Sequence, residues 1–394
     1  MNNNFEKILA HLVNEIGERP VGSSGNHASL ALLERQFVKL GYNLKNLDFD
    51  CYCWEYGESS IKTTQRNHPI HPGGFSNFFE GTCPIELIET VDQLESANLE
   101  NKIAVLNGTI SNEPLMPKDF PFYYPEEHQR IINALESKNP SAIVAVTGKH
   151  PFCGLNPFPL FDDGNFNIPN ACMDQNSANK INYSENKLTL TINSRRIPGK
   201  SRQLVASTRD SCPRKIVICG HMDTAYNTPG ALDNATGLIV MLKLAARISS
   251  YSGDYKLEFV PFNGEEYYGV SGQLAYLADQ EQKAESIALV INIDSPGHTN
   301  SKTALSFYNF NPSDKKKVQK VMDSHQICET GSQWIAGDHS IFAFRNIPCI
   351  AVTSSDLESE IMGFSHTPRD TINHVDPAIL EETAIFLEDY ITSF

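Results

Sequence analysis

The sequence has no long hydrophobic run: no stretch of its 394 residues approaches the roughly 20 apolar residues that a membrane-spanning helix needs. Basic residues are also scarce, with 32 lysines and arginines against 47 acidic residues and a net charge of −15. A surface of that sign repels phosphate backbones and anionic lipid headgroups, so we expect neither nucleic acid nor a membrane as a partner. The same charge is compatible with a site that attracts metal cations or the free amino termini of peptides.

Two further absences concern targeting and cysteine chemistry. Residues 1–7 contain no basic segment that leads into an apolar core, so no secretory signal is visible. We expect a cytoplasmic location, or an exported protein if a signal has been removed from the sequence. The nine cysteines form no CxxC pair, and Cys51 and Cys53 lie two apart in an apparent strand, which is a poor geometry for a disulfide. We therefore expect mostly buried thiols in a reducing compartment.

The order of the expected elements divides the chain into two domains. Apolar side chains recur at helical spacing in residues 5–16 and 30–40, and residues 44–56 look strand-like. From residue 199 onward apolar strands alternate with helices, which is the pattern of a parallel sheet covered on both faces. Its expected strands are residues 216–219, 257–261, 288–293, 304–308 and 348–352, and residues 377–393 form a closing helix. We predict an α/β catalytic domain, residues 1–56 and 199–394, whose mixed, mostly parallel sheet is flanked by helices.

Residues 57–198 have a different texture and are predicted to form an inserted, mostly β second domain. Proline, glycine and asparagine are frequent there, and no long alternation of helices and strands occurs. The expected elements are strands at 102–108, 142–148 and 188–192 and a short helix at 130–138. His68 and His71 are of a metal-ligand type, but we interpret the Pro/Gly-rich stretch that contains them, residues 68–74, as a surface loop.

The stretch richest in chemistry begins where an apolar strand ends. Residues 214–220 form a short apolar run that ends in glycine, and His221 and Asp223 follow it. Asp233 comes ten residues after Asp223, just before a mostly apolar stretch that reads as a buried helix. In open α/β sheets ligands collect outside the carboxyl ends of the strands, so these side chains stand where a site is expected.

Later strand ends and loops add further ligand types. Glu265 and Glu266 follow the next strand, Asp294 follows the one after it, and His366 lies in a later loop. Imidazole and carboxylate ligands suit zinc, cobalt or manganese, and the lack of thiolates argues against a structural cysteine site. Five ligands divide evenly between two ions about 3.5–4 Å apart if Asp233 bridges them. Of the two adjacent glutamates, one would bind a metal and the other would face its water as a general base.

These residues, in this order, resemble the co-catalytic zinc aminopeptidases, a family that includes leucyl aminopeptidases and relatives of glutamate carboxypeptidase. The resembling motifs are His221-Met222-Asp223, Gly230-Ala231-Leu232-Asp233-Asn234, Asn263-Gly264-Glu265-Glu266, Asp294 and His366-Thr367-Pro368-Arg369-Asp370-Thr371. Residues 19–23 and 41–42 resemble the helical lead-in of the family, and residues 57–198 resemble a protease-associated domain. The resemblance covers nearly the whole chain and implies the zinc-peptidase fold.

The resemblance also implies how the metal ligands are divided. His221, Asp233 and Asp294 would hold one zinc ion. Asp233, Glu266 and His366 would hold the second.

Three further residues receive roles from the same resemblance. Glu265 would be the general base of a hydrolase. Asp223 would accept a hydrogen bond from the far nitrogen of His221 and so fix the tautomer of that ligand. His339, in the pair Asp338-His339, would hydrogen-bond the substrate or play a structural role. The implied substrate is a peptide with a free N-terminus, whose amine sits among the carboxylates of the site.

Three other functions remain open from the sequence. A glutaminyl-cyclase-like acyltransferase has the same fold with one zinc ion and would suit the Asp338-His339 pair. A glutamate-releasing carboxypeptidase is a second enzymatic alternative. A non-catalytic receptor on this fold would be expected to have lost ligands, whereas all six residues of metal and proton chemistry are present here. We therefore favour an aminopeptidase.

Overall fold

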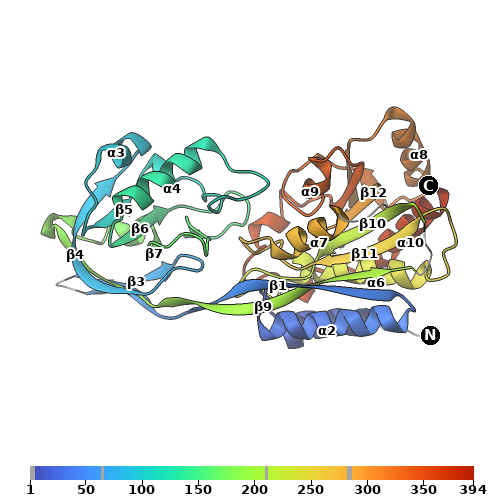
Figure 1. The fold of residues 1–394 in the computed structure, drawn as a ribbon, viewed down its shortest axis with the longest axis horizontal. Coiled ribbons are helices and arrows are strands. Elements are labelled where there is room, and N and C mark those ends of the chain that lie inside the picture. The colour runs from blue at the N-terminus through green and yellow to red at the C-terminus, as the bar shows by residue number, and fades with distance from the viewer. Residues whose placement is uncertain (1–4, 64–65, 209–211, 282–285) are drawn as a thin grey trace. The chain divides into compact units, whose positions relative to one another are not determined.

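The chain forms two compact units, shown in the computed structural model of Figure 1, which describes residues 5–63, 66–208, 212–281 and 286–394. Unit 1 comprises Met1–Cys51 and Lys200–Phe394, and unit 2 comprises Tyr52–Gly199. The predicted domains, with junctions at residues 56 and 199, differ from these units by a few residues. Strands β1 (Asn43–Tyr56) and β9 (Ser194–Ser207) run across the junctions, which accounts for the difference.

In the described part of unit 1 the strands form an eight-stranded mixed sheet, in the order β1-β9-β11-β10-β12-β15-β13-β14. The strands at its centre run parallel to one another, while β9 and β13 are antiparallel to their inner neighbours. The strands not yet bounded are β10 (Arg214–His221), β11 (Lys256–Phe262), β12 (Ser286–Ile293), β13 (Thr303–Tyr308), β14 (Cys328–Thr330) and β15 (Cys349–Ser354). The prediction of an α/β fold with a mixed, mostly parallel sheet is confirmed.

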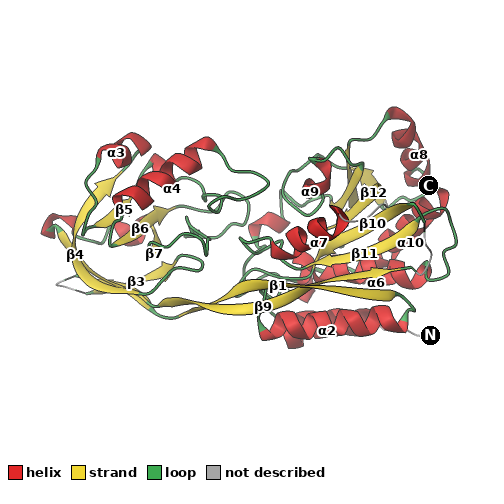
Figure 2. Ribbon diagram, in the orientation of Figure 1, coloured by secondary structure: helices red, strands yellow, loops and turns green. Residues whose placement is uncertain are grey.

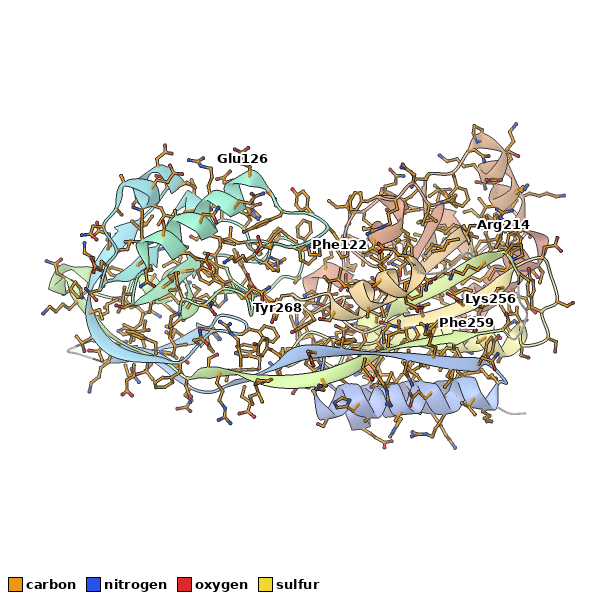
Figure 3. All side chains as sticks on the ribbon, in the orientation of Figure 1. Phe122, Glu126, Arg214, Lys256, Phe259 and Tyr268 are labelled. Atoms are coloured by element: carbon orange, nitrogen blue, oxygen red, sulfur yellow. The ribbon has the colours of Figure 1, made fainter. Side chains whose placement is uncertain are left out.

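Successive side chains of a strand point to opposite faces of the sheet, so mostly apolar strands present apolar surface on both faces. Helices cover both of these faces. Figure 2 shows the helices of unit 1 around its strands. Phe259 of β11, labelled in Figure 3, points into the larger core and meets Phe37 of α2 with ring centroids 5.8 Å apart. Phe262 faces the opposite way and packs against Tyr276 of α7 (Ser271–Glu281) and Phe342 of α9 (Ser340–Ala343). The larger core also takes in α1 (Phe5–Ala10), α2 (Ser24–Lys39), α6 (Gly237–Arg247), α8 (Pro312–Met322) and α10 (Pro377–Ser393).

The N-terminal helices match the predicted apolar periodicity, and the turn between them matters for the site. Helix α1 continues as a π-helical segment, η1 (His11–Ile16), which ends at Gly17 with a φ of 70°. Glycine adopts that left-handed conformation without a steric penalty. Ser23 then caps α2 by accepting a hydrogen bond from the backbone N–H of Asn26. Arg19 therefore lies in a short, fixed connection between two helices.

Unit 2 is a closed barrel with strand order β2-β3-β7-β6-β5-β4-β8, which confirms the prediction of a second, β-rich domain. Its strands are β2 (Ser59–Lys62), β3 (Asn67–Pro72), β4 (Phe79–Ile88), β5 (Ile103–Leu106), β6 (Ala142–Thr147), β7 (Asn170–Asp174) and β8 (Lys187–Ile192). The predicted short helix is α4 (Glu126–Lys138), which contacts α3 (Val91–Ser96). A short helix, α5 (Gln175–Ala178), follows β7.

The prediction of a loop at residues 68–74 is wrong for residues 68–72, which belong to strand β3. Pro69 pairs only with β2, because the pairing of β3 with β7 begins at His71. Proline lacks a backbone N–H and is tolerated in a strand where one side is unpaired. Among the described residues, neither His68 nor His71 belongs to a group that could hold a metal ion.

Two sequence expectations can be compared with the described chain as a whole. Five of the nine cysteines are buried, which agrees with the expectation of mostly buried thiols. No helix among the described residues is long and apolar enough to cross a membrane.

A buried ion pair lies near the amino ends of β10 and β11. Lys215 donates to the carboxylate of Glu258 at 3.0 Å, and their side chains are 0% and 1% exposed. Glu258 also accepts from the hydroxyl of Tyr276 at 3.0 Å and lies 3.3 Å from the ammonium of Lys256. The pair connects neighbouring strands at the end of the sheet opposite to the carboxyl ends.

Replacing Lys215 with Met should lower the free energy of unfolding by about 3–5 kcal/mol, because a buried carboxylate loses its closest charge partner. Urea unfolding followed by fluorescence measures the change. The double variant Lys215→Met, Glu258→Leu should lose less, because it leaves no buried carboxylate behind. A loss for the single variant no larger than that of an exposed lysine such as Lys316→Met would contradict this interpretation.

Candidate metal centre

The parallel strands of unit 1 bring the predicted ligands to one edge of the sheet. His221 ends β10, Asp294 follows β12, and the pairing of β10 with β12 and of β12 with β15 aligns their carboxyl ends. Nε2 of His221 lies 3.0 Å from Oδ1 of Asp233 and 3.6 Å from Oδ1 of Asp294. These three side chains form one group whose potential ligand atoms all lie within 4.8 Å of one another.

A second group shares Asp233 with the first. Nε2 of His366 lies 3.2 Å from Oδ2 of Asp233 and 2.6 Å from Oε1 of Glu266. Asp233, Glu266 and His366 again offer ligand atoms within 4.8 Å of one another. The two oxygens of Asp233 therefore face different histidines, the arrangement that a bridging carboxylate requires. Burial acts to raise the pKa of Asp233, but both imidazoles oppose this and hold the pKa below its usual range.

The arrangement of the candidate ligand atoms suits a bound metal ion better than it suits hydrogen bonds between the side chains. Oε1 of Glu266 is buried and has no hydrogen-bond partner, although it lies 2.6 Å from Nε2 of His366. Two atoms that approach so closely without hydrogen-bond geometry are expected where both point at a third atom. Two imidazoles and three carboxylates are also the ligand types that zinc prefers in catalytic sites.

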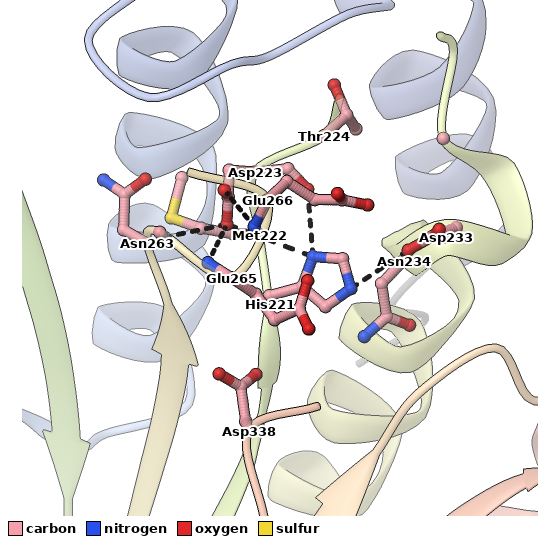
Figure 4. A network of polar contacts seen from close by, with 12 residues as sticks. His221, Met222, Asp223, Thr224, Asp233, Asn234, Asn263, Glu265, Glu266 and Asp338 are labelled. Carbon is pink, nitrogen blue, oxygen red and sulfur yellow. Dashed lines mark hydrogen bonds and ion pairs between the residues drawn. The ribbon is translucent and has the colours of Figure 1, made fainter. Parts of the chain in front are cut away.

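Asp223 binds the backbone of the glutamate loop. Its carboxylate accepts hydrogen bonds from the N–H groups of Gly264, Glu265 and Glu266 at 2.9, 3.2 and 3.0 Å. The predicted hydrogen bond from His221 to this carboxylate is not formed, because Nδ1 lies 3.9 Å from Oδ1 and 3.1 Å from the Asp223 carbonyl oxygen. Figure 4 shows the ring of His221 between Asp223 and Asp233, with the glutamate loop facing Asp223. The tautomer of His221 is thus tied to a backbone carbonyl.

Glu265 lies in surroundings that raise the pKa of its carboxyl group. Its side chain is only partly exposed, and burial together with Glu266, Asp338 and Asp294 raises its pKa well above the usual range, although His221 opposes this. The loop that carries it follows β11 directly, and the φ of Gly264 is 145°, a conformation that favours glycine. The loop therefore turns sharply and exposes two adjacent glutamates from one fixed backbone.

Asn263 fixes this loop from the other side, and the sequence analysis did not find its role. Its side-chain amide donates to Asn26 of α2, to Ser201 of β9 and to the carbonyl of Arg202, and it is fully buried. Its backbone N–H donates to the side chain of Gln203. The Asn-Gly pair before the two glutamates was the only sequence signal that could have indicated this anchoring.

Asn234 performs a similar task between the two aspartate ligands. Its amide donates to the carbonyl of Ile293, and its oxygen accepts from the N–H groups of Gly237 and Ser295. The segment η4 (Ala231–Thr236) that contains it has non-helical backbone angles at Asp233 and Asn234, and the peptide bond between them is cis. The ends of β12 and the start of α6 are thereby held together.

His339 belongs to neither of the two candidate ligand groups. It is fully buried, with Nε2 3.0 Å from the carbonyl of Trp334 and Nδ1 3.3 Å from the side-chain nitrogen of Asn292. Burial lowers its pKa. These contacts favour the structural alternative for His339 over contact with a substrate.

Its neighbour Asp338 is an acidic group with one oxygen bonded to Gln273 at 2.8 Å and the other buried without a partner. Burial raises the pKa of Asp338 to about 7.

The geometry agrees with what comparison with known proteins finds. The sequence profile of peptidase family M28 matches residues 203–391. Aminopeptidase YwaD of Bacillus subtilis is 27% identical over 182 residues, and this chain spans only 39% of the length of that relative. A solved zinc aminopeptidase from Bacillus subtilis superposes with a TM-score of 0.74 at 18% identity, over 98% of this chain and 93% of that one.

A glutaminyl cyclase from Fimbriiglobus ruber also superposes, with a TM-score of 0.53 at 12% identity, over 100% of this chain and 96% of that one. At such identities the likeness extends to the fold alone. The family match covers the part of the chain that carries the ligand groups and agrees with the prediction of a hydrolase. Over residues 203–391 this chain is therefore similar to peptidase family M28, in agreement with the family that its motifs resemble.

Proposed function

We propose that the protein is a metallo-aminopeptidase that removes N-terminal residues from peptides with two zinc ions. The observation that carries the proposal is the pair of ligand groups that share Asp233, each with one histidine and one further carboxylate. His221, Asp233 and Asp294 would hold one ion, and Asp233, Glu266 and His366 the other. Cobalt or manganese would suit the same ligands.

Zinc ions held there would polarise the peptide carbonyl and make water a stronger acid. Glu265 would take the proton from the attacking water and pass it to the leaving amine. A raised pKa suits this task, because a base that must later act as an acid works best when its pKa lies near the operating pH. Its partial exposure gives water access to the carboxylate.

The acidic character of the site supports a substrate with a free N-terminus. Carboxylates that are not used up by metal binding attract an α-ammonium group and disfavour a substrate carboxylate. Asp338, with one buried oxygen unpartnered, adds to that charge when it is ionised. This argument favours an aminopeptidase over a glutamate-releasing carboxypeptidase.

The second candidate is a glutaminyl-cyclase-like acyltransferase. The shared fold and the buried Asp338-His339 pair favour it. Against it stand two ligand groups rather than one, both made of described residues. We also propose, from the sequence resemblance alone, that the barrel of unit 2 is a protease-associated domain.

Asp223 would serve this reaction as a positioning residue. Its three hydrogen bonds fix the backbone that carries both Glu265 and Glu266. It would therefore act on the base and on the second metal, and less on the ion held by His221.

The variant Glu265→Gln should keep both zinc ions and lose about 10²- to 10⁴-fold in kcat, because it retains the shape of the side chain without its basicity. Zinc content by mass spectrometry and turnover of leucyl-p-nitroanilide measure the two properties. Glu382→Gln, an exposed glutamate on α10, is the matched control and should behave as wild type. Turnover of Glu265→Gln at the wild-type rate would remove Glu265 from the mechanism.

A panel of substrates tests the reaction itself. Aminoacyl-p-nitroanilides should be cleaved in the presence of zinc, while the same compounds with a blocked amine, γ-glutamyl dipeptides and peptides with N-terminal glutamine should react at least tenfold more slowly. Cyclisation of N-terminal glutamine as the fastest reaction would favour the acyltransferase. A preference for blocked peptides would overturn the aminopeptidase proposal.

The variant Asp223→Asn should weaken the second zinc more than the first, because an amide group would place an N–H against the N–H groups of the loop. A stepwise zinc titration, compared with Glu266→Gln and Asp294→Asn as references for the two groups, assigns the affected ion. We expect about a 10- to 100-fold loss of affinity at the group containing Glu266. A loss confined to the ion held by Asp294 would instead indicate that Asp223 acts through His221.

A further inference from the structure

Arg19 is a fully buried cation that binds the loop between two candidate ligands. Nε donates to the carbonyl of Met222 at 2.9 Å, and Nη1 and Nη2 donate to the carbonyls of Pro229 and Gly230 at 2.7 and 2.8 Å. The backbone N–H of Arg19 donates to the hydroxyl of Thr224 at 2.9 Å. Arg19 thus holds both ends of residues 222–230, which are most of the segment between His221 and Asp233.

The guanidinium group has no adjacent carboxylate to account for its burial. Within the described chain, no acidic oxygen lies at ion-pair distance from it, and the acceptors of its hydrogen bonds are all carbonyl oxygens. The carboxylates that stabilise its charge act from farther away and belong to Asp370, Asp223 and Asp233. Burying an arginine costs free energy unless its N–H groups are hydrogen-bonded. Among the described residues, the guanidinium N–H groups donate only to carbonyls of residues 222–230 and of Gly17.

Asp370 holds the next residues of the same segment from the opposite side. Its carboxylate accepts from the N–H groups of Leu232 and Asp233 at 2.9 and 3.0 Å, and its carbonyl accepts from Ala231. From Pro229 to Asp233, every residue therefore gives one backbone group to Arg19 or Asp370.

Gly230 allows this close approach. Its φ is 60°, and a Cβ atom there would lie 2.3 Å from Cγ2 of Thr224 and 2.5 Å from the carbonyl oxygen of Asp233. Only glycine fits between these neighbours without displacing them. The segment is therefore fixed in conformation just before the shared carboxylate.

We propose that Arg19 and Asp370 are positioning residues that set the Asp233 carboxylate in its bridging place, the guanidinium by binding carbonyls and the carboxylate by binding N–H groups. The inference rests on the proposed metal site and goes beyond it by assigning its geometry to two residues 351 positions apart in the printed sequence. Because Asp233 belongs to both ligand groups, displacing it should weaken both ions together.

Two variants with different chemistry test the assignment. Arg19→Lys keeps the charge but offers one nitrogen, which cannot reach three carbonyls at the geometry of a guanidinium group. Asp370→Asn keeps the shape and loses one acceptor, so that an N–H of Leu232 or Asp233 remains unpaired. The matched control is Glu258→Gln, which likewise turns a buried carboxylate into an amide but lies at the far end of β11.

Metal-free protein is titrated with Zn²⁺ by calorimetry, and thermal unfolding is recorded for each variant without metal. Both binding steps should weaken about 10- to 100-fold in Arg19→Lys and in Asp370→Asn, the usual effect of losing a group that orients metal ligands. Glu258→Gln should lower the unfolding temperature and bind Zn²⁺ as the wild type does. Turnover lost by Arg19→Lys should return at high Zn²⁺ concentration.

Wild-type Zn²⁺ affinity in variants whose unfolding temperature falls would overturn the inference, because the two residues would then be purely structural. The same holds if only one binding step weakens. The metal titration needs no substrate. A wild-type protein that binds two ions but cleaves no aminoacyl substrate would therefore overturn the proposed function, while the titration would still support the role of Arg19 and Asp370.

Discussion

The edge of unit 1 that carries the candidate ligands is stable only because its many negative charges are compensated. Acidic side chains converge there from separate parts of the chain, and burial raises the pKa of several of them, to about 7 for Asp338 and about 6 for Asp370. Such a cluster is stable only if positive charge or hydrogen-bond donors accompany it. The protein supplies backbone N–H groups to Asp223 and Asp370, imidazoles to Asp233, and the more distant charge of Arg19. Under our proposal two zinc ions provide the rest.

The part of this arrangement that the sequence predicts follows from periodicity and strand order. Apolar runs ending at Gly220, Phe262 and Ile293 predict neighbouring parallel strands, and parallel strands place their carboxyl ends at one edge. Histidine and carboxylate side chains gather at that edge, among them His221, Asp233 and Asp294. These residue types predict a metal site even before the positions of the side chains are known. The β-rich second unit follows in the same way from a change in composition.

What the sequence does not predict depends on contacts between distant residues or on backbone atoms. The anchoring roles of Asn234 and Asn263 consist of hydrogen bonds to main-chain groups, which no side-chain pattern encodes. The interpretation of Asp223 as the partner of the His221 ring fails for the same reason, since the carbonyl of that residue occupies the position expected for its carboxylate. Proline and glycine content suggested a loop at residues 68–74, whereas pairing on one side permits a strand at Pro69.

The contact of Arg19 with residues 222–230 has a consequence for synthesis of the protein. During synthesis the partners of Arg19 in residues 222–230 emerge about 200 residues after it, beyond the whole of unit 2. His366 and Asp370 come later still. Domains generally fold as units during translation, N-terminal parts first, yet no fragment that stops before His366 contains both ligand groups. A nascent chain that has not yet reached His366 therefore lacks one of the two candidate ligand groups, and under our proposal it would have no hydrolytic capacity.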